Sequence, residues 1–146
     1  MKRLLLPWTC VFLFFVAYEW LYHGVIIISL YKETPWMWRP LGHLYGTWPI
    51  IVLGQMLQSF AFTYAFTKGY EAKGANEGIR YGMLIWTMFE GHYLVLYSIQ
   101  PITLILLYLW LVGSCLQYVF AGIILTKVYK PSIAFVEEEI PNALQA

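Results

Sequence analysis

The chain has 146 residues, of which 60% are hydrophobic and only 12% are charged, with a net charge of +1. A soluble domain is closer to about one half apolar and one quarter charged, so the surplus apolar side chains must face something other than a small core. A lipid bilayer is the medium that fits. The near-zero net charge gives no indication of a nucleic-acid partner. Cys10 and Cys115 lie inside apolar runs and are interpreted as small buried hydrophobic residues rather than a disulfide or a metal site.

Four long apolar runs follow one another along the chain, at residues 4–30, 48–67, 81–99 and 102–126. Each is close to or above the ~20 residues that a helix needs to cross the hydrocarbon core. They are continuously apolar rather than alternating, which favours helices over the strands of a barrel. We therefore predict an all-α integral membrane protein with four transmembrane helices. Residues 1–130 would form one domain, and residues 131–146 a short acidic tail.

The distribution of Lys and Arg predicts the orientation of these helices, because the two residue types concentrate on the cytoplasmic side of membrane proteins. Both termini and the tail are then expected in the cytoplasm. The first run is expected to remain as a span, since it is too long for a signal peptide and no small-residue cleavage site follows it. Seven basic residues lie on one side and two on the other: Lys2, Arg3, Lys68, Lys73, Arg80, Lys127 and Lys130 against Lys32 and Arg39.

The second and fourth runs resemble each other. GQMLQSFAFTYAFTKGYE aligns without a gap with GSCLQYVFAGIILTKVYK, and the first and third runs align more weakly through Glu19 and Glu90. This predicts two helical hairpins in the same orientation, about residues 4–67 and 81–126, as a parallel internal repeat about an axis along the membrane normal. The aligned pairs are Gly54 with Gly113, Leu57 with Leu116, Gln58 with Gln117, Thr67 with Thr126, Lys68 with Lys127 and Tyr70 with Tyr129.

Each predicted helix carries a strongly polar side chain at a similar depth, about 14–16 Å from a helix end. A carboxylate that faces lipid costs several kcal/mol, so these side chains are expected to point into the bundle. His23 lies one turn beyond Glu19 on the same helix face and can pair with it. The expected central polar layer is Glu19, His23, Gln55, Gln58, Glu90, His92 and Gln117, and the small residues expected to let helices approach closely are Gly54, Gly113 and Ala121.

The stretches YEWLYHGVII, TPWMWRP, LGQMLQSFAFTYAFTKGYEAKG and YSIQP resemble a family of small bacterial four-helix inner-membrane proteins without an assigned function. The resemblance covers the chain from about Ala17 to Pro131. It implies the topology and a multi-pass location in the bacterial inner membrane. Its motifs define shape rather than catalysis, so it implies little about activity.

No P-loop, glycine-rich nucleotide turn, HExxH or CxxC motif occurs in the sequence, so an enzyme is disfavoured. The favoured function is a non-enzymatic membrane protein, an accessory subunit or a homo-oligomer, with the polar layer as interhelical glue. One alternative is a small carrier or channel for protons or a small polar solute, using Glu19 and Glu90. A second is a redox protein that binds metal or haem, for which His23, His92, Glu19 and Glu90 are acceptable ligands. No cofactor is predicted, and the residues leave a metal or haem open.

Overall fold

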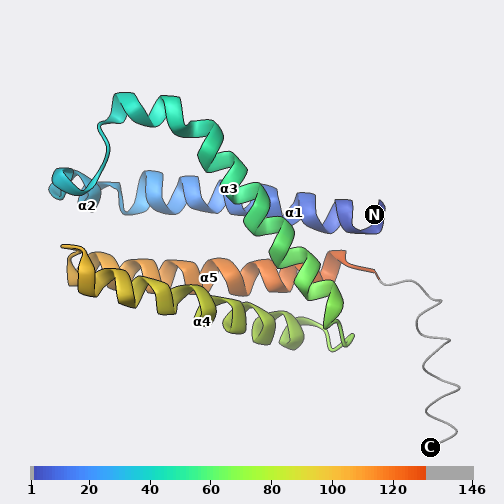
Figure 1. Ribbon diagram of the computed structural model, residues 1–146. Helices are drawn as coiled ribbons and strands as arrows, with labels where there is room; N and C mark the ends of the chain where they lie inside the picture. The colour runs from blue at the N-terminus through green and yellow to red at the C-terminus, as the bar shows by residue number, and fades with distance from the viewer. Residues whose placement is uncertain (1, 131–146) are drawn as a thin grey trace, which may run out of the picture.

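The computed structural model describes residues 2–130, and this part of the chain is helical, without any β-strand. This confirms the all-α prediction, while the predicted tail at 131–146 lies outside the described residues. The elements, shown in Figure 1, are α1 (Lys2–Leu21), the π-helical turn η1 (Tyr22–Ile26), α2 (Ile28–Glu33), the 3₁₀ turn η2 (Pro35–Met37), α3 (Leu41–Lys68), α4 (Ala75–Ile99) and α5 (Leu104–Val128).

Three helical segments are long and apolar enough to cross a membrane, at Arg3–Ile26, Gly46–Lys68 and Leu104–Val128. The shortest of them spans about 34 Å at 1.5 Å per residue, which exceeds the hydrocarbon thickness of about 30 Å. α4 is as long as α5 but less apolar, because Glu90, His92 and several aromatic residues interrupt its aliphatic side chains. The described chain thus has three candidate spans, and the predicted fourth span through α4 is not shown.

The first helix changes its hydrogen-bond pattern near its predicted outer end. The apolar run predicted at 4–30 is regular only to Leu21 and then passes through the π-helical turn η1, where the Ile27 amide donates to the Tyr22 carbonyl at 3.0 Å. Turns of this kind are rare and are often found at functional sites. α3 begins at Leu41 rather than near residue 48, so part of the predicted first loop is helical.

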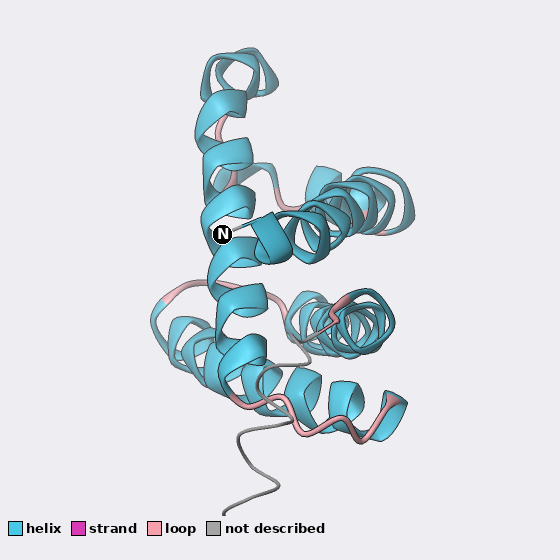
Figure 2. Ribbon diagram, turned by 90° about the vertical axis from the view of Figure 1, so that its right-hand side faces the viewer, coloured by secondary structure: helices cyan, strands magenta, loops and turns pink. Residues whose placement is uncertain are grey.

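The helices form a layer with one oblique member. Figure 1 shows α1, α5 and α4 side by side with α3 crossing them at a slant, and Figure 2 shows α3 running across the other three, which are seen nearly end-on. α4 and α5 share the largest interface, while α1 packs on both α3 and α5. The α1–α3 pair and the α4–α5 pair are therefore arranged differently, and the predicted repeat is not confirmed by the fold.

Glycines set the close packing of α4 on α5. Gly78 and Gly82 lie one turn apart on α4 and are buried. A Cβ added at Gly78 would meet the backbone of Gly122 on α5, and one added at Gly82 would meet the backbone of Tyr118. G-x-x-x-G spacing allows such close backbone contact between membrane helices. The stretch GIRYG carries this spacing, and it is missing from the packing residues predicted from the sequence.

The first hairpin lacks these small residues. In the alignment of the two halves, the positions of the three glycines are occupied by Pro7, Val11 and Thr63. Their side chains keep the backbones of α1 and α3 further apart. This difference gives a physical reason why two similar sequences pack at different angles.

Aromatic side chains fix α1 and α4 to their neighbours through hydrogen bonds to backbone carbonyls. Buried Tyr and Trp side chains usually find a partner for their polar end. In a bilayer that partner must come from the protein, because lipid offers none. The bonds are Tyr18 Oη to the Gly113 carbonyl at 2.7 Å, Tyr22 Oη to the Leu109 carbonyl at 2.8 Å, Tyr81 Oη to the Phe62 carbonyl at 2.5 Å and Trp86 Nε1 to the Leu111 carbonyl at 3.0 Å.

The connection between α3 and α4 is organised around a buried carboxylate. Glu77, in the first turn of α4, accepts the backbone amides of Glu71 at 2.7 Å and Lys73 at 2.8 Å. Gly74 adopts a positive φ of 67° directly before α4, a conformation that favours glycine. Both oxygens of one side chain therefore hold the loop in a single shape.

A second carboxylate in this loop is exposed. Glu71 pairs with Lys73 at 2.7 Å and with Arg80 at 3.0 Å, and these two cations lower the pKa of Glu71 from its usual value. A lowered pKa means that the folded loop favours the ionised carboxyl. This contribution is present near neutral pH and is lost as the pH falls through the lowered pKa. It is small because solvent and salt screen an exposed pair.

Candidate functional site

The first part of the predicted polar layer is a hydrogen-bonded cluster at the end of α1. Glu19 Oε2 lies 3.3 Å from His23 Nε2, and both side chains are about one-third exposed. The other ring nitrogen of His23, Nδ1, lies 2.5 Å from the Tyr31 hydroxyl. The π-helical turn and α2 carry Tyr31 back over His23, so that the two rings stack with their centroids 5.9 Å apart. The predicted Glu19–His23 pair is therefore present.

The cluster continues to α5 through Tyr31. Trp110 Nε1 donates a hydrogen bond to the Tyr31 oxygen at 2.8 Å. Trp38 lies against both rings, with centroids 4.8 Å from Tyr31 and 6.1 Å from Trp110. This packing joins α1, the segment after it and α5. The result is a series of four hydrogen-bonded side chains within an otherwise apolar region: Glu19, His23, Tyr31 and Trp110.

A pocket of about 290 Å³ opens beside this cluster, between α1 and α3. Its polar lining comes from Glu19, His23 and Gln55, and two indole rings, Trp20 and Trp48, form part of its wall. The Oε1 atom of Gln55 is buried and has no hydrogen-bond partner among the described residues. The remaining lining residues are Val16, Ile51 and Val52.

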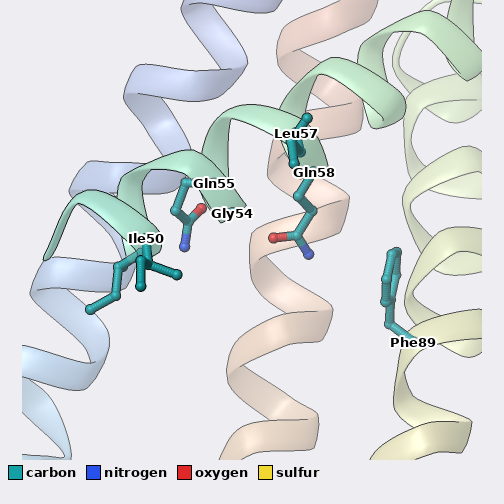
Figure 3. Close-up of a pocket in the computed structure, with 7 residues that line it drawn as sticks. Ile50, Gly54, Gln55, Leu57, Gln58 and Phe89 are labelled. Carbon is teal, nitrogen blue, oxygen red and sulfur yellow. The ribbon is translucent and has the colours of Figure 1, made fainter. Parts of the chain in front are cut away.

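A second, wider hollow of about 500 Å³ lies between α3 and α4 and shares Ile51 and Gln55 with the pocket. Figure 3 shows the amides of Gln55 and Gln58 on α3 and the ring of Phe89 on α4 across from them. Gln58 Nε2 donates to the hydroxyl of Tyr118 on α5. Of the three glutamines of the predicted layer, Gln55 lines the pocket together with Glu19.

The remaining members of the predicted layer are divided between the core and the surface. Glu90 is 4% exposed and Gln117 is 6% exposed, so both side chains lie in the core. Ser114 is a polar neighbour of the Glu90 carboxyl, yet Glu90 Oε2 has no hydrogen-bond partner among the described residues. His92 is exposed on the outside of α4, two residues further along. The structure therefore separates His92 from the other members of the layer.

The three predicted packing residues also have different surroundings. Ala121 is fully buried, and a Cβ at Gly113 would meet the ring of Tyr22. Gly54 is exposed, and nothing lies within 4 Å of a Cβ added there. The prediction that Gly54 packs against a neighbouring helix is therefore wrong within a single chain, because Gly54 lies on an exposed side of α3.

Tyr31, Trp110 and Tyr118 belong to the site and are missing from the residues predicted for it. Trp110 and Tyr118 present an indole N–H and a hydroxyl within the fourth apolar run, and Tyr31 lies directly after the first run. Such groups need partners in lipid, so the position of Trp110 and Tyr118 in an apolar run is the signal that would have found them.

Among residues 2–130, no three His, Cys, Asp or Glu side chains are grouped closely enough to hold a metal ion. No protein-family model, curated protein or solved structure matches the chain. The class of the protein therefore rests on the fold itself, which is all-helical in its described part and has three segments suited to a bilayer.

Proposed function

We propose that this chain is a non-enzymatic integral membrane protein with four spanning helices that works as a homo-oligomer, with α3 at the contact between copies. The observation that carries the proposal is Gly54. Glycine in a helix lowers the stability of that helix by about 0.5–1 kcal/mol relative to alanine. In membrane helices, glycine usually allows close backbone contact with a neighbouring helix. The glycines of the α4–α5 interface have such contacts within the chain, whereas Gly54 has none.

The surroundings of Gly54 support a second copy as the occupant. Ile50 is 68% exposed and Leu57 is 62% exposed, and together with Gly54 they line one side of the hollow between α3 and α4. Two copies inserted in the same direction carry this surface at the same depth. A two-fold axis along the membrane normal would then bring Gly54 of one copy against Gly54 of the other.

Replacing Gly54 with leucine should leave the single chain folded and weaken self-association at least tenfold, because the added side chain keeps the two backbones apart. Energy transfer between donor-labelled and acceptor-labelled copies in liposomes, measured over a range of lipid-to-protein ratios, reports the association. Gly91→Leu is the matched control, since Gly91 is equally open but does not line the hollow. Wild-type chains that stay monomeric at every ratio would exclude self-association and leave lipid or a different subunit in the hollow.

The proposed topology has both termini and the α3–α4 loop in the cytoplasm of a bacterial cell. In a background of Cys10→Ala and Cys115→Ala, Asn76→Cys should resist a membrane-impermeant thiol reagent in intact cells. Lys32→Cys, on the other side, should react readily. Asn76 and Lys32 are both exposed, so a difference in labelling reports their side of the membrane rather than burial. The reverse pattern would overturn the orientation.

A further inference from the structure

The hydrogen bonds around Glu19 run in one direction. An indole N–H can only donate, so the Tyr31 oxygen accepts from Trp110. The Tyr31 hydroxyl can then donate its own proton to His23 Nδ1, which places the remaining ring proton of a neutral imidazole on Nε2, facing Glu19. In this arrangement of protons, each donor in the hydrogen-bonded series from Trp110 to His23 points towards the carboxylate of Glu19.

In the neutral tautomer of His23 that this arrangement describes, no cation of the pocket cancels the charge of an ionised Glu19. A neutral His23 stabilises an ionised Glu19 through a hydrogen bond but does not cancel its charge. No Lys or Arg within the described part of the chain forms an ion pair with Glu19. Gln55, whose Oε1 is buried and has no hydrogen-bond partner among the described residues, also lines this pocket. A ligand that completes the site must therefore bring positive charge and hydrogen-bond donors.

We propose that the pocket between α1 and α3 binds a small primary alkylammonium ion, with the ammonium group between Glu19 and Gln55. The indole rings of Trp20 and Trp48, which form part of the wall, attract cations through their π faces. The apolar side chains of Val16, Ile51 and Val52 accommodate the alkyl part of the ligand. A volume of about 290 Å³ is at the lower end for ligand pockets and suits a small molecule.

The position of the pocket gives the ligand a route of entry. Trp48 lies two residues after the start of the apolar segment Gly46–Lys68, and Gln55 lies seven residues further along α3. The pocket therefore extends from near the start of this segment to about 13 Å along the helix. The ligand enters from the membrane interface at that end, and the charged group does not have to cross the hydrocarbon core.

Titration calorimetry of the whole chain in nanodiscs of zwitterionic lipid tests the site with three probes. n-Butylammonium carries both charge and donors, tetramethylammonium carries charge alone, and n-butanol carries a donor without charge. We expect saturable binding of n-butylammonium and no binding of n-butanol. Glu19→Gln should weaken n-butylammonium at least tenfold. Gln55→Leu should weaken n-butylammonium about tenfold and leave tetramethylammonium unchanged, because only the primary ammonium donates to the amide oxygen.

Glu33→Gln is the matched control, because Glu33 is an exposed carboxylate of α2 that does not line the pocket, and it should bind like the wild type. Equal binding of n-butanol and n-butylammonium would overturn the proposal, as would wild-type affinity in a folded Glu19→Gln variant or an equal loss in Glu33→Gln. If Glu19→Gln does not fold, the three probes on the wild type and on Gln55→Leu still decide the question. In that case an absent response to n-butylammonium means that the carboxyl is neutral and the site is structural.

Discussion

Gly82→Leu should destabilise the chain more than any other single change considered for this fold, by at least ~2–3 kcal/mol. The added side chain would meet the backbone of Tyr118 and Val119, which cannot move away without separating α4 from α5. The expected result is a large loss of helical signal at moderate temperature and aggregation of the purified protein. Thermal unfolding in detergent, followed by circular dichroism, measures it.

Gly91→Leu provides the control for this prediction within the same helix. A Cβ at Gly91 meets nothing within 4 Å, so leucine there should leave the midpoint of unfolding unchanged or slightly raised through its higher helix propensity. An equal loss of stability in both variants would mean that leucine disturbs α4 itself. A harmless Gly82→Leu would show that α4 and α5 are not in backbone contact.

Glu77→Gln should loosen the α3–α4 loop almost as much as Glu77→Ala. Both carboxylate oxygens accept backbone amides, so an amide side chain turns one NH₂ group towards an N–H that also donates. The loss of one hydrogen bond to a charged acceptor, together with the contact between two donors that replaces it, corresponds to about 2–3 kcal/mol locally. Hydrogen exchange at the amides of Glu71 and Lys73 measures the opening of the loop.

Glu71→Gln is the counterpart of this test, because Glu71 is exposed and its ion pairs are screened. It should change exchange at these amides very little at neutral pH. If it accelerates exchange as strongly as Glu77→Gln, the ion pairs of the loop and not the buried carboxylate hold its shape.

The sequence predicts the main helical segments because their cause is local. Apolar runs longer than the bilayer core form helices whatever their neighbours are. Gly69 and Pro101 lie just after the ends of α3 and α4, whereas Pro49 lies inside α3 and does not end it. The pairing of Glu19 with His23 follows from a spacing of four residues in one helix, so it was also predictable. Features that depend on a single stretch of chain could therefore be predicted from the sequence.

Contacts between helices were predicted less well, because an all-round apolar helix does not reveal which side faces protein. The sequence predicts a similar depth for Gln55 and Gln58, but their partners depend on the slant of α3. With this slant, Gln55 lines a pocket with Glu19, and Gln58 donates a hydrogen bond to Tyr118. The slant in turn follows from bulky side chains where α4 and α5 have glycine. Spacing alone could not assign these partners.

The hydrogen bonds of α1 have a consequence for the order of assembly. Tyr18 and Tyr22 donate to carbonyls of Gly113 and Leu109, so α1 docks on a helix that is synthesised later, after α3 and α4. α4 and α5 are joined by only a few residues and touch along their length, so they can associate as soon as both have been inserted. Until then these two tyrosines have no partner on α5 in the nascent chain. A truncation that removes α5 would therefore leave two hydroxyl groups of α1 without the acceptors that they have in the full fold.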